Sequence, residues 1–402
     1  MAITIVSSPN TLTSLAYRPI IYTWTSDAVD LQYCIVEVLI NDIRVSARSV
    51  QMDSGSTTAF TLDISSECQK HLSFQLKPIN SSGVLTNDTG ESIQNIKIYE
   101  VTVDSGGLIV TDYSASDDNN SSFQYQSVNN LITNWLESHF DYANFNLLDY
   151  RLSSNTSLFM TSSPYAKSIE LDSDEFIGLF YHLGAASKNF KLEVLTYNSA
   201  GNLLNTDNIN ITEWNTPIGV TPVDSYLSIA VGTKNLINEG ISLTTVSHYT
   251  IQVINDDGDQ SEIKRYNIVQ ACSSDTRIHW ANKFGKQSSY TFKGNKLESL
   301  THNSSTYKQA LGLTYSSEGR GDSVIQATST TNFTTYTDSV SRDTYRFISE
   351  ILVNKIAWLQ VGNDYFPITI DNGTKLVLNE RDMPMQFNLN FSFANSTKGL
   401  RG

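Results

Sequence analysis

Short stretches in which apolar and polar residues alternate, each closed by a turn signal, constrain this chain more than any other feature. In the first hundred residues they fall at 3–6, 19–24, 33–40, 43–50 and 60–64. Alternation with a period of two puts every second side chain on one face, as in a half-buried β-strand. Several short strands at this spacing predict two packed sheets, so we expect a β-sandwich at the N-terminus.

The same alternation continues to the C-terminus and includes a clear hairpin. Further strands are expected at 158–161, 168–171, 175–181, 190–197, 357–361, 365–370, 375–378 and 385–393. Residues 249–254 and 262–269 alternate on either side of Asp257-Gly258, which supplies the positive φ of a tight turn. Residues 198–202 read as another turn, and 290–345 is rich in Ser and Thr, which favours long antiparallel strands or an extended arm.

Two short helices are expected against this background. Residues 65–72 begin with Ser65 and Ser66, either of which can cap a helix N-terminus. Residues 128–140 place an apolar stripe at helical spacing, formed by Val128, Leu131, Ile132, Trp135, Leu136 and His139. The predicted fold class is therefore mainly β, with several β-sandwich modules and one or two short helices.

The length of the chain predicts more than one domain. Its 402 residues exceed what a single hydrophobic core usually supports. Changes in pattern suggest boundaries near residues 100 and 275. We expect an N-terminal β-sandwich at 1–98, a central β-rich domain with one short helix at 99–275, and a C-terminal β-rich domain that can include an extended arm at 276–402.

Charge and hydropathy bound the partners and the location. A net charge of −14 and a pI near 4.8 argue against direct nucleic-acid binding, which needs clustered Lys and Arg. No run of about 18 apolar residues occurs, so we expect no membrane insertion. Residues 1–6 lack the basic region and long apolar core of a secretory signal, so we expect synthesis in the cytoplasm without secretion.

Sequence signatures of catalysis and metal binding are missing. The chain has no phosphate-binding Gly-rich loop, no HExxH, no GxSxG and no paired CxxC. Cys34, Cys68 and Cys272 are odd in number and widely spaced, which fits neither a disulfide framework nor a zinc ribbon. The six histidines are scattered. We therefore expect no enzymatic activity, no cofactor and no metal.

Two local motifs have ordinary structural explanations. Asp256, Asp257 and Asp259 crowd oxygen atoms around a glycine, but they lack the alternate spacing and terminal Glu of an EF-hand, so a hairpin turn explains them better. The tripeptide Arg320-Gly321-Asp322 matches an integrin-type adhesion motif. Three residues match by chance in many proteins, and a Gly-centred turn accounts for them.

Residues 249–292 have the most distinctive order of residue types in the chain. After the hairpin come Cys272, the run Arg277-Ile278-His279-Trp280-Ala281-Asn282-Lys283-Phe284-Gly285 and the strand Ser289-Tyr290-Thr291-Phe292. This order of a tryptophan, an asparagine, a glycine and a Tyr-Thr-Phe strand resembles a recurring segment in virion proteins of tailed phages that infect Bacteroidota. Residues 5–20 and 159–164 also resemble that group, although Lys286 stands where the group tends to have a second glycine.

The resemblance implies a structural virion protein. It implies immunoglobulin-like modules and a non-enzymatic component of the tail, neck ring or baseplate, located in the virion. The implied partners are other virion proteins and further copies of the chain. No catalytic residue is carried over. The residues that stand out as assembly or packing candidates are Trp280, Asn282, Gly285, Tyr290 and Phe292.

Two alternative functions come from other classes. A receptor-binding or carbohydrate-binding tail protein, an adhesin, would use Tyr, Trp and Asn at loop tips to stack on sugars and to hydrogen-bond them, with a host surface glycan or receptor as its partner. An enzyme that degrades surface polysaccharide would need a pair of carboxylates. Asp and Glu are too common in this chain for any such pair to be chosen.

Overall fold

The structure, a computed structural model, is mainly β. It describes residues 3–7, 14–15, 20–26, 31–40, 43–53, 59–70, 76–79, 81, 84–85, 94–104, 107–110, 126–128, 131–132, 147–150, 152, 157–182, 190–211, 224–272, 275–294, 296–308, 322–353, 356–371, 385–394 and 398–401. The prediction of a mainly β chain with several immunoglobulin-like or other β-sandwich modules is confirmed.

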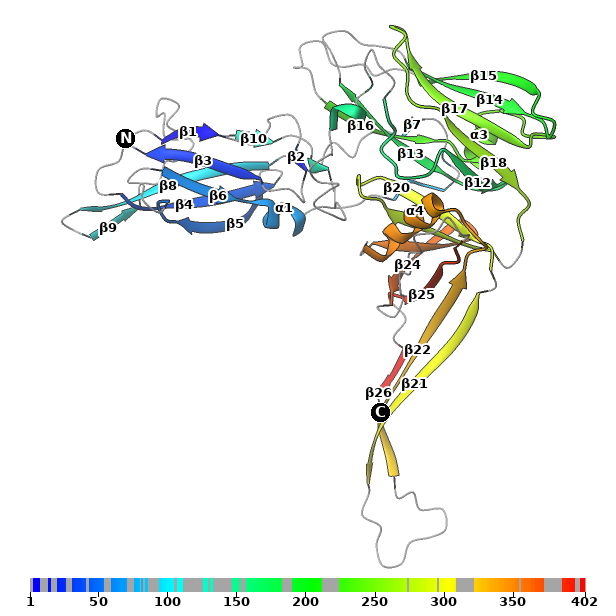
Figure 1. The fold of residues 1–402 in the computed structure, drawn as a ribbon. Helices are drawn as coiled ribbons and strands as arrows, with labels where there is room; N and C mark the ends of the chain where they lie inside the picture. The colour runs from blue at the N-terminus through cyan, green and yellow to red at the C-terminus, as the bar shows by residue number, and fades with distance from the viewer. Residues whose placement is uncertain are drawn as a thin grey trace, which may run out of the picture.

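The N-terminal part is a β-sandwich (Figure 1). One sheet has the order β1-β3-β6, formed by Ile3–Ser7, Ile21–Ser26 and Ala59–Asp63. The other has the order β10-β8-β4-β5, formed by Gln126–Val128, Gln94–Asp104, Leu31–Ile40 and Ile43–Val50, with β9 (Gly107–Val110) beside β8. A two-stranded sheet pairs β2 (Ser14–Leu15) with β11 (Leu131–Ile132).

The alternation seen in the sequence forms the core of this sandwich. In β3, Tyr22 and Trp24 are buried while Thr23 between them is partly exposed, and Val36 is buried on the opposing strand β4. The Trp24 ring stacks on that of Phe60 from β6, with centroids 5.5 Å apart. Large aromatic side chains in such contact supply much of the buried apolar area of a small core.

A second sandwich follows in the middle of the chain. Its larger sheet has the order β12-β18-β17-β14-β15, formed by Ala166–Glu170, Lys264–Val269, His248–Asn255, Phe190–Tyr197 and Leu203–Ile211. The smaller sheet has the order β13-β16-β7, formed by Phe176–His182, Asp224–Ala230 and Val84–Leu85. The predicted hairpin is confirmed, because β17 and β18 pair antiparallel and Gly258 between them has φ 87°.

The C-terminal part is a larger sheet covered by a helix. The strand order is β20-β19-β23-β24-β25-β22-β21, formed by Gln287–Phe292, Thr276–Ala281, Ala357–Val361, Asp364–Ile370, Asn388–Phe393, Asp322–Tyr336 and Leu297–Lys308, with β26 (Lys398–Arg401) beside β22. Helix α4 (Arg342–Val353) buries Phe347, Ile348 and Ile351 in the same core as Trp280. The rings of Trp280 and Phe347 lie 5.1 Å apart.

The helices differ in part from expectation. The helix expected at 65–72 is confirmed as α1 (Ser65–Lys70). The helix expected at 128–140 is wrong at its start, where β10 and β11 lie, and residues 133–140 are outside the described part. Helices α3 (Thr233–Asn238) and α4 were not predicted, so the described residues hold three α-helices rather than one or two, besides a 3-10 turn at Leu147–Tyr150. The stretch 375–378 also lies outside the described residues.

Residues 76–85 tie the N-terminal sandwich to the rest of the chain. The strands β6 and β8 on either side of this segment belong to the first sandwich, but β7 pairs with β16 of the second. The Lys77 N–H donates to Gln287 Oε1 at 2.8 Å, and Asn235 Nδ2 donates to the Ser81 carbonyl at 2.7 Å. One segment thus contacts both the second sandwich and the C-terminal sheet. Within the described part of the chain, no helix is long and apolar enough to span a membrane.

Candidate functional site

The five assembly or packing candidates lie in the β19–β20 hairpin at one edge of the C-terminal sheet, and three of them belong to its core or pack against it. Trp280 and Phe292 are fully buried there, and Tyr290 is partly buried against the same cluster. The Tyr290 and Phe292 rings meet edge to face at 5.2 Å. Asn282 and Gly285 shape the turn between the strands, where Gly285 has φ 70°.

Asn282 organises this turn and joins it to the second sandwich. Its Oδ1 accepts hydrogen bonds from the backbone N–H groups of Phe284 at 2.9 Å and Lys286 at 3.0 Å. Its Nδ2 donates to the carbonyl of Met160 at 3.2 Å. A buried amide that uses both ends in this way is held in one orientation. The segment that contains Trp280 and Asn282 therefore packs at the junction between the second sandwich and the C-terminal sheet.

A cluster of buried charges lies at the same junction. Glu175 accepts from Lys167 Nζ at 2.6 Å and from Arg277 Nη2 at 3.1 Å, and the Ser289 hydroxyl donates to it at 2.5 Å. The side chains of Lys167, Glu175 and Arg277 are only 5%, 4% and 9% exposed. Burial lowers the pKa of Lys167 to about 8, against the opposing attraction of Glu175. The Glu175 carboxylate already has its hydrogen-bond partners and is shielded from solvent. The cluster therefore connects the second sandwich to the C-terminal sheet in the interior of the protein.

A hairpin arm formed by β21 and β22 projects from the C-terminal sheet. In Figure 1 it runs away from β20, β24 and β25 of that sheet, and β26 lies beside β22 within it. All twelve residues of β21 are exposed, and among the described strands β21 pairs with β22 alone, from Leu297 opposite Thr334 to Lys308 opposite Asp322. No Asp, Glu, Lys or Arg occurs in 299–307 or in 323–336. The arm therefore presents a long, uncharged strand edge.

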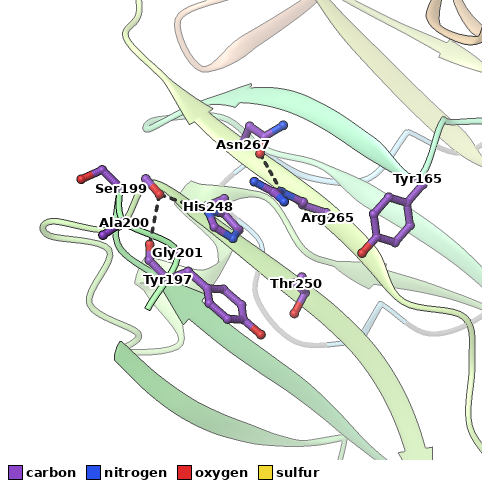
Figure 2. A pocket seen from close by; sticks show the side chains of 10 residues that line it. Tyr165, Tyr197, Ser199, Ala200, Gly201, His248, Thr250, Arg265 and Asn267 are labelled. Carbon is purple, nitrogen blue, oxygen red and sulfur yellow. Dashed lines mark hydrogen bonds between the residues drawn. The ribbon is translucent and has the colours of Figure 1, made fainter. Parts of the chain in front are cut away.

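A shallow basin of about 700 Å³ lies over the outer face of the larger sheet of the second sandwich (Figure 2). It is lined by Tyr165, Tyr197, Ser199, Ala200, Gly201, Ser247, His248, Thr250, Arg265 and Asn267. Strand pairing places Tyr197 opposite His248 and His248 opposite Asn267, while Thr250 lies opposite Arg265. The predicted turn at 198–202 is confirmed, and it forms one rim of the basin.

Contacts within the basin hold its side chains in place. The Tyr197 and His248 rings stack at 4.7 Å with an interplanar angle of 3°. Arg265 Nε donates to Asn267 Oδ1 at 2.9 Å. Partial burial, and then the Arg265 charge, lower the pKa of His248, which favours the neutral imidazole at neutral pH. The basin thus combines fixed aromatic rings with one guanidinium.

Sequence reasoning missed both the basin and the charge cluster. Tyr197, His248 and Asn267 occupy outward-facing positions of alternating strands, but only the pairing register brings them together. Glu175 and Arg277 are 102 residues apart, and no local signal links them. Of the adhesion tripeptide, Arg320 and Gly321 lie outside the described residues. Among the residues that are described, no group of three or more His, Cys, Asp or Glu is placed to hold a metal ion.

Comparison with known proteins gives weak likeness to modular β-sandwich proteins. No protein-family model and no curated protein matches the chain. Among solved structures, fibronectin(III)-like modules of Clostridium thermocellum CbhA match at 11% identity over 67% of this chain and 93% of that one, with a TM-score of 0.17. A 1.5-MDa bacterial ice-binding adhesin matches at 8% identity over 97% and 96%, with a TM-score of 0.18.

A complex of immunoglobulin domains, Dpr2 Ig1-Ig2 with DIP-Theta Ig1-Ig3, also matches, at 9% identity over 98% of this chain and 90% of that chain. Its TM-score is 0.21. TM-scores this low carry no argument about the arrangement of the modules or about function. The functional reading therefore depends on the surfaces of this chain itself.

Proposed function

We propose that the chain is a non-enzymatic structural protein that assembles with copies of itself through the hairpin arm, as a component of a phage tail, neck ring or baseplate. The observation that carries the assembly is the edge strand β21, in which every residue is exposed. The place in a phage particle is supported by the resemblance of residues 277–292 to virion proteins.

The arm has the properties of an unfinished sheet. Strands β25 and β26 pair with β22 on its other side, so β21 is the open edge of the arm, and an open edge offers a row of unpaired N–H and C=O groups. Soluble proteins usually protect such edges with charges, prolines or bulges. In β21 the only charged residues are Glu298 and Lys308, near the two ends, and the exposed Leu300 lies between them. Nothing along the middle of the edge repels an added strand.

A second copy of β21 is the partner that fits this edge. Two identical strands can pair antiparallel about a twofold axis. A residue i of one copy then lies opposite a residue j of the other, and residue j of the first copy lies opposite residue i of the second. Because residues 299–307 carry no formal charge, the pairing brings no like charges together. At about 3.3 Å per residue, a 12-residue strand offers an edge of about 40 Å. Strand addition of this kind derives its affinity from main-chain hydrogen bonds.

The test is the molar mass of the purified protein by light scattering coupled to size exclusion. We expect the wild type to elute at a multiple of 44.7 kDa, and the double variant Leu300→Lys/Tyr307→Lys to elute as a 44.7-kDa monomer, because pairing would bring the four added lysines of two copies onto one short edge. Leu171→Lys is the matched control, since Leu171 is 49% exposed but lies outside the arm. It should leave the mass unchanged.

Two outcomes would overturn the assembly proposal: a wild type that is monomeric at micromolar concentration, or a double variant that keeps the wild-type mass. The virion location has its own test, which is mass spectrometry of purified phage particles from a producing strain. Absence of the chain from intact particles contradicts that location and leaves the assembly result standing.

A further inference from the structure

The basin on the second sandwich is the surface of this molecule with the most specific chemistry outside the arm. We propose that it binds a carboxylate-bearing saccharide, in which Arg265 holds the carboxylate and the sugar ring lies between Tyr165 and Tyr197. Neither tyrosine nor the arginine is part of the hairpin arm, so this function goes beyond assembly and does not depend on it.

The charge of the basin differs from that of the whole chain. The sequence has 41 Asp and Glu against 27 Lys and Arg, yet none of the ten lining residues is acidic and one is an arginine. An acidic protein normally repels anions from most of its surface. A locally cationic basin therefore favours a ligand that carries a small negative charge at one point.

Arg265 is positioned for a carboxylate. Its Nε is engaged by Asn267 Oδ1 at 2.9 Å, which fixes the plane of the guanidinium. Among the described residues, no acceptor contacts its two terminal nitrogens. A guanidinium held in this way presents two parallel N–H donors, which match the two oxygens of a carboxylate.

The tyrosines and hydroxyls fit a sugar ring. Tyr165 is 59% exposed, and the ring of Tyr197 is held by stacking on His248. Figure 2 shows Thr250 between these two tyrosines, with Arg265 on the next strand. Tyrosine offers a rigid apolar face with a polar tip, which suits a ligand with apolar C–H faces and a rim of hydroxyls. The hydroxyls of Thr250 and Ser199 and the amide of Asn267 can exchange hydrogen bonds with sugar hydroxyls.

Other anions fit the basin less well. A phosphate dianion is usually held by several donors, such as backbone N–H groups, a helix N-terminus or a lysine, and the basin is lined by strands and one turn with a single cation. A nucleic acid would bring many phosphates to a chain of net charge −14. One carboxylate on a largely uncharged, hydroxyl-rich ligand matches both the single guanidinium and the open aromatic floor.

The test is calorimetric titration of the full chain with sialyllactose and with trigalacturonate, using the methyl ester of each as its matched neutral probe. We expect an acidic probe to bind and its neutral counterpart to bind at least about tenfold more weakly, because a charge-assisted bidentate contact is lost. Arg265→Gln should weaken the acidic probe by about tenfold or more and leave the neutral probe unchanged. Arg265→Lys, which keeps the charge without the fork, should fall between them.

Two further variants separate the roles. Tyr165→Ala should weaken acidic and neutral probes alike, because it removes ring contact and no charge. Lys191→Gln is the charge control, since Lys191 lies on the outer face of the same sheet in β14 but outside the lining of the basin, and it should change nothing. The arm variant Leu300→Lys/Tyr307→Lys should bind as the wild type does, so a failure of assembly and a failure of saccharide binding are distinguishable.

Four results would overturn the proposal. Neither acidic probe binds at millimolar concentration; Arg265→Gln binds as the wild type does; or Arg265→Gln and Lys191→Gln weaken binding equally, which indicates non-specific attraction. Displacement of the bound probe by an equal concentration of inorganic phosphate would also overturn it, because the site would then recognise a simple anion.

Discussion

At the scale of single residues, the buried carboxylate of Glu175 joins the second sandwich to the C-terminal sheet. This carboxylate sits between Lys167 and Arg277, and all three side chains are almost fully buried. Buried ions lose their hydration, so each depends on its partners for compensation. Arg277 comes from the C-terminal sheet, and the other two residues come from the second sandwich. The complete ion cluster therefore forms only when the two units are in contact.

We expect Glu175→Gln to lower the free energy of unfolding by about 3–5 kcal/mol, because it leaves two buried cations without their carboxylate. Urea denaturation followed by tryptophan fluorescence measures this loss. Asp172→Asn is the matched control, since Asp172 is 83% exposed and lies 3.6 Å from Lys234. An exposed pair contributes at most about 1 kcal/mol, so similar losses in the two variants would contradict the buried role of Glu175.

The buried tyrosines predict a loss of stability at alkaline pH. Partial burial raises the pKa of Tyr150, Tyr290 and Tyr365 to about 12, and full burial raises the pKa of Tyr249 well above its usual value. The unfolded chain ionises near pH 10, so it binds fewer protons than the folded chain from about pH 10 to 12. The stabilising contribution is therefore complete below pH 10 and is lost as the pH rises through 12.

A pH titration followed by tyrosinate absorbance and by circular dichroism tests whether stability falls as the pH rises. Ionisation of the buried tyrosines should coincide with loss of structure. Tyr249→Phe, which removes a phenol that donates to the Val231 carbonyl at 2.7 Å, should make the loss of stability above pH 10 less steep. Tyr165→Phe should leave the slope unchanged, because Tyr165 is exposed. Ionisation of all tyrosines near pH 10 without unfolding would contradict the prediction.

At the scale of elements, helix α3 depends on a close backbone approach at its start. Gly232 is the residue before the first turn, and its N–H donates to Asn235 Oδ1 at 3.0 Å. A Cβ added at Gly232 would lie 2.3 Å from the Ser173 carbonyl oxygen and 2.4 Å from the Glu175 nitrogen. Both neighbours are backbone atoms of the segment that carries the buried carboxylate.

Gly232→Ala should therefore destabilise the chain by about 3 kcal/mol, because the backbone must move to accept the new carbon. Gly258→Ala is the control, since Gly258 has φ 87° with nothing near its Cβ position. It should cost only about 1 kcal/mol, the price of a left-handed conformation for alanine. Thermal denaturation of both variants measures the difference, and an equal loss would argue against the close contact.

At the scale of the whole molecule, the contacts between the three units differ in extent. The second sandwich and the C-terminal sheet share the Glu175 cluster and the bond from Asn282 to the Met160 carbonyl. The core of the N-terminal sandwich is a separate apolar cluster, joined to the others by residues 76–85. We therefore expect the second sandwich and the C-terminal sheet to unfold as one cooperative unit and the N-terminal sandwich as another.

Scanning calorimetry should show two transitions. Trp24→Phe, in the N-terminal core, should lower one of them by about 4–8 °C, since it loses about 1 kcal/mol of packing in a module of roughly 100 residues. Glu175→Gln should lower only the other. A single transition that both variants lower would contradict this prediction, because the three units would then unfold as one cooperative body.

The sequence by itself determined the local features of this protein. Alternation placed many of the strands and with them the β-sandwich class, although the strand predicted at 158–161 is wrong, and the Asp257-Gly258 pair located the β17–β18 hairpin. These features depend on neighbours along the chain, where side-chain period and turn conformation act directly. The helical spacing at 128–132 misled because pairing of these residues with β8 and β2 outweighed a weak local preference.

Only the tertiary structure decided which distant residues meet. Strand register brought Tyr197, His248 and Asn267 onto one surface, and the contact between two units placed Arg277 beside Glu175. The crossing of β7 into the second sandwich also follows from pairing rather than from pattern. A strand's alternation fixes which side chains share its face, but it leaves open which strand lies beside it and in which register, and every surface with a candidate function here depends on that choice.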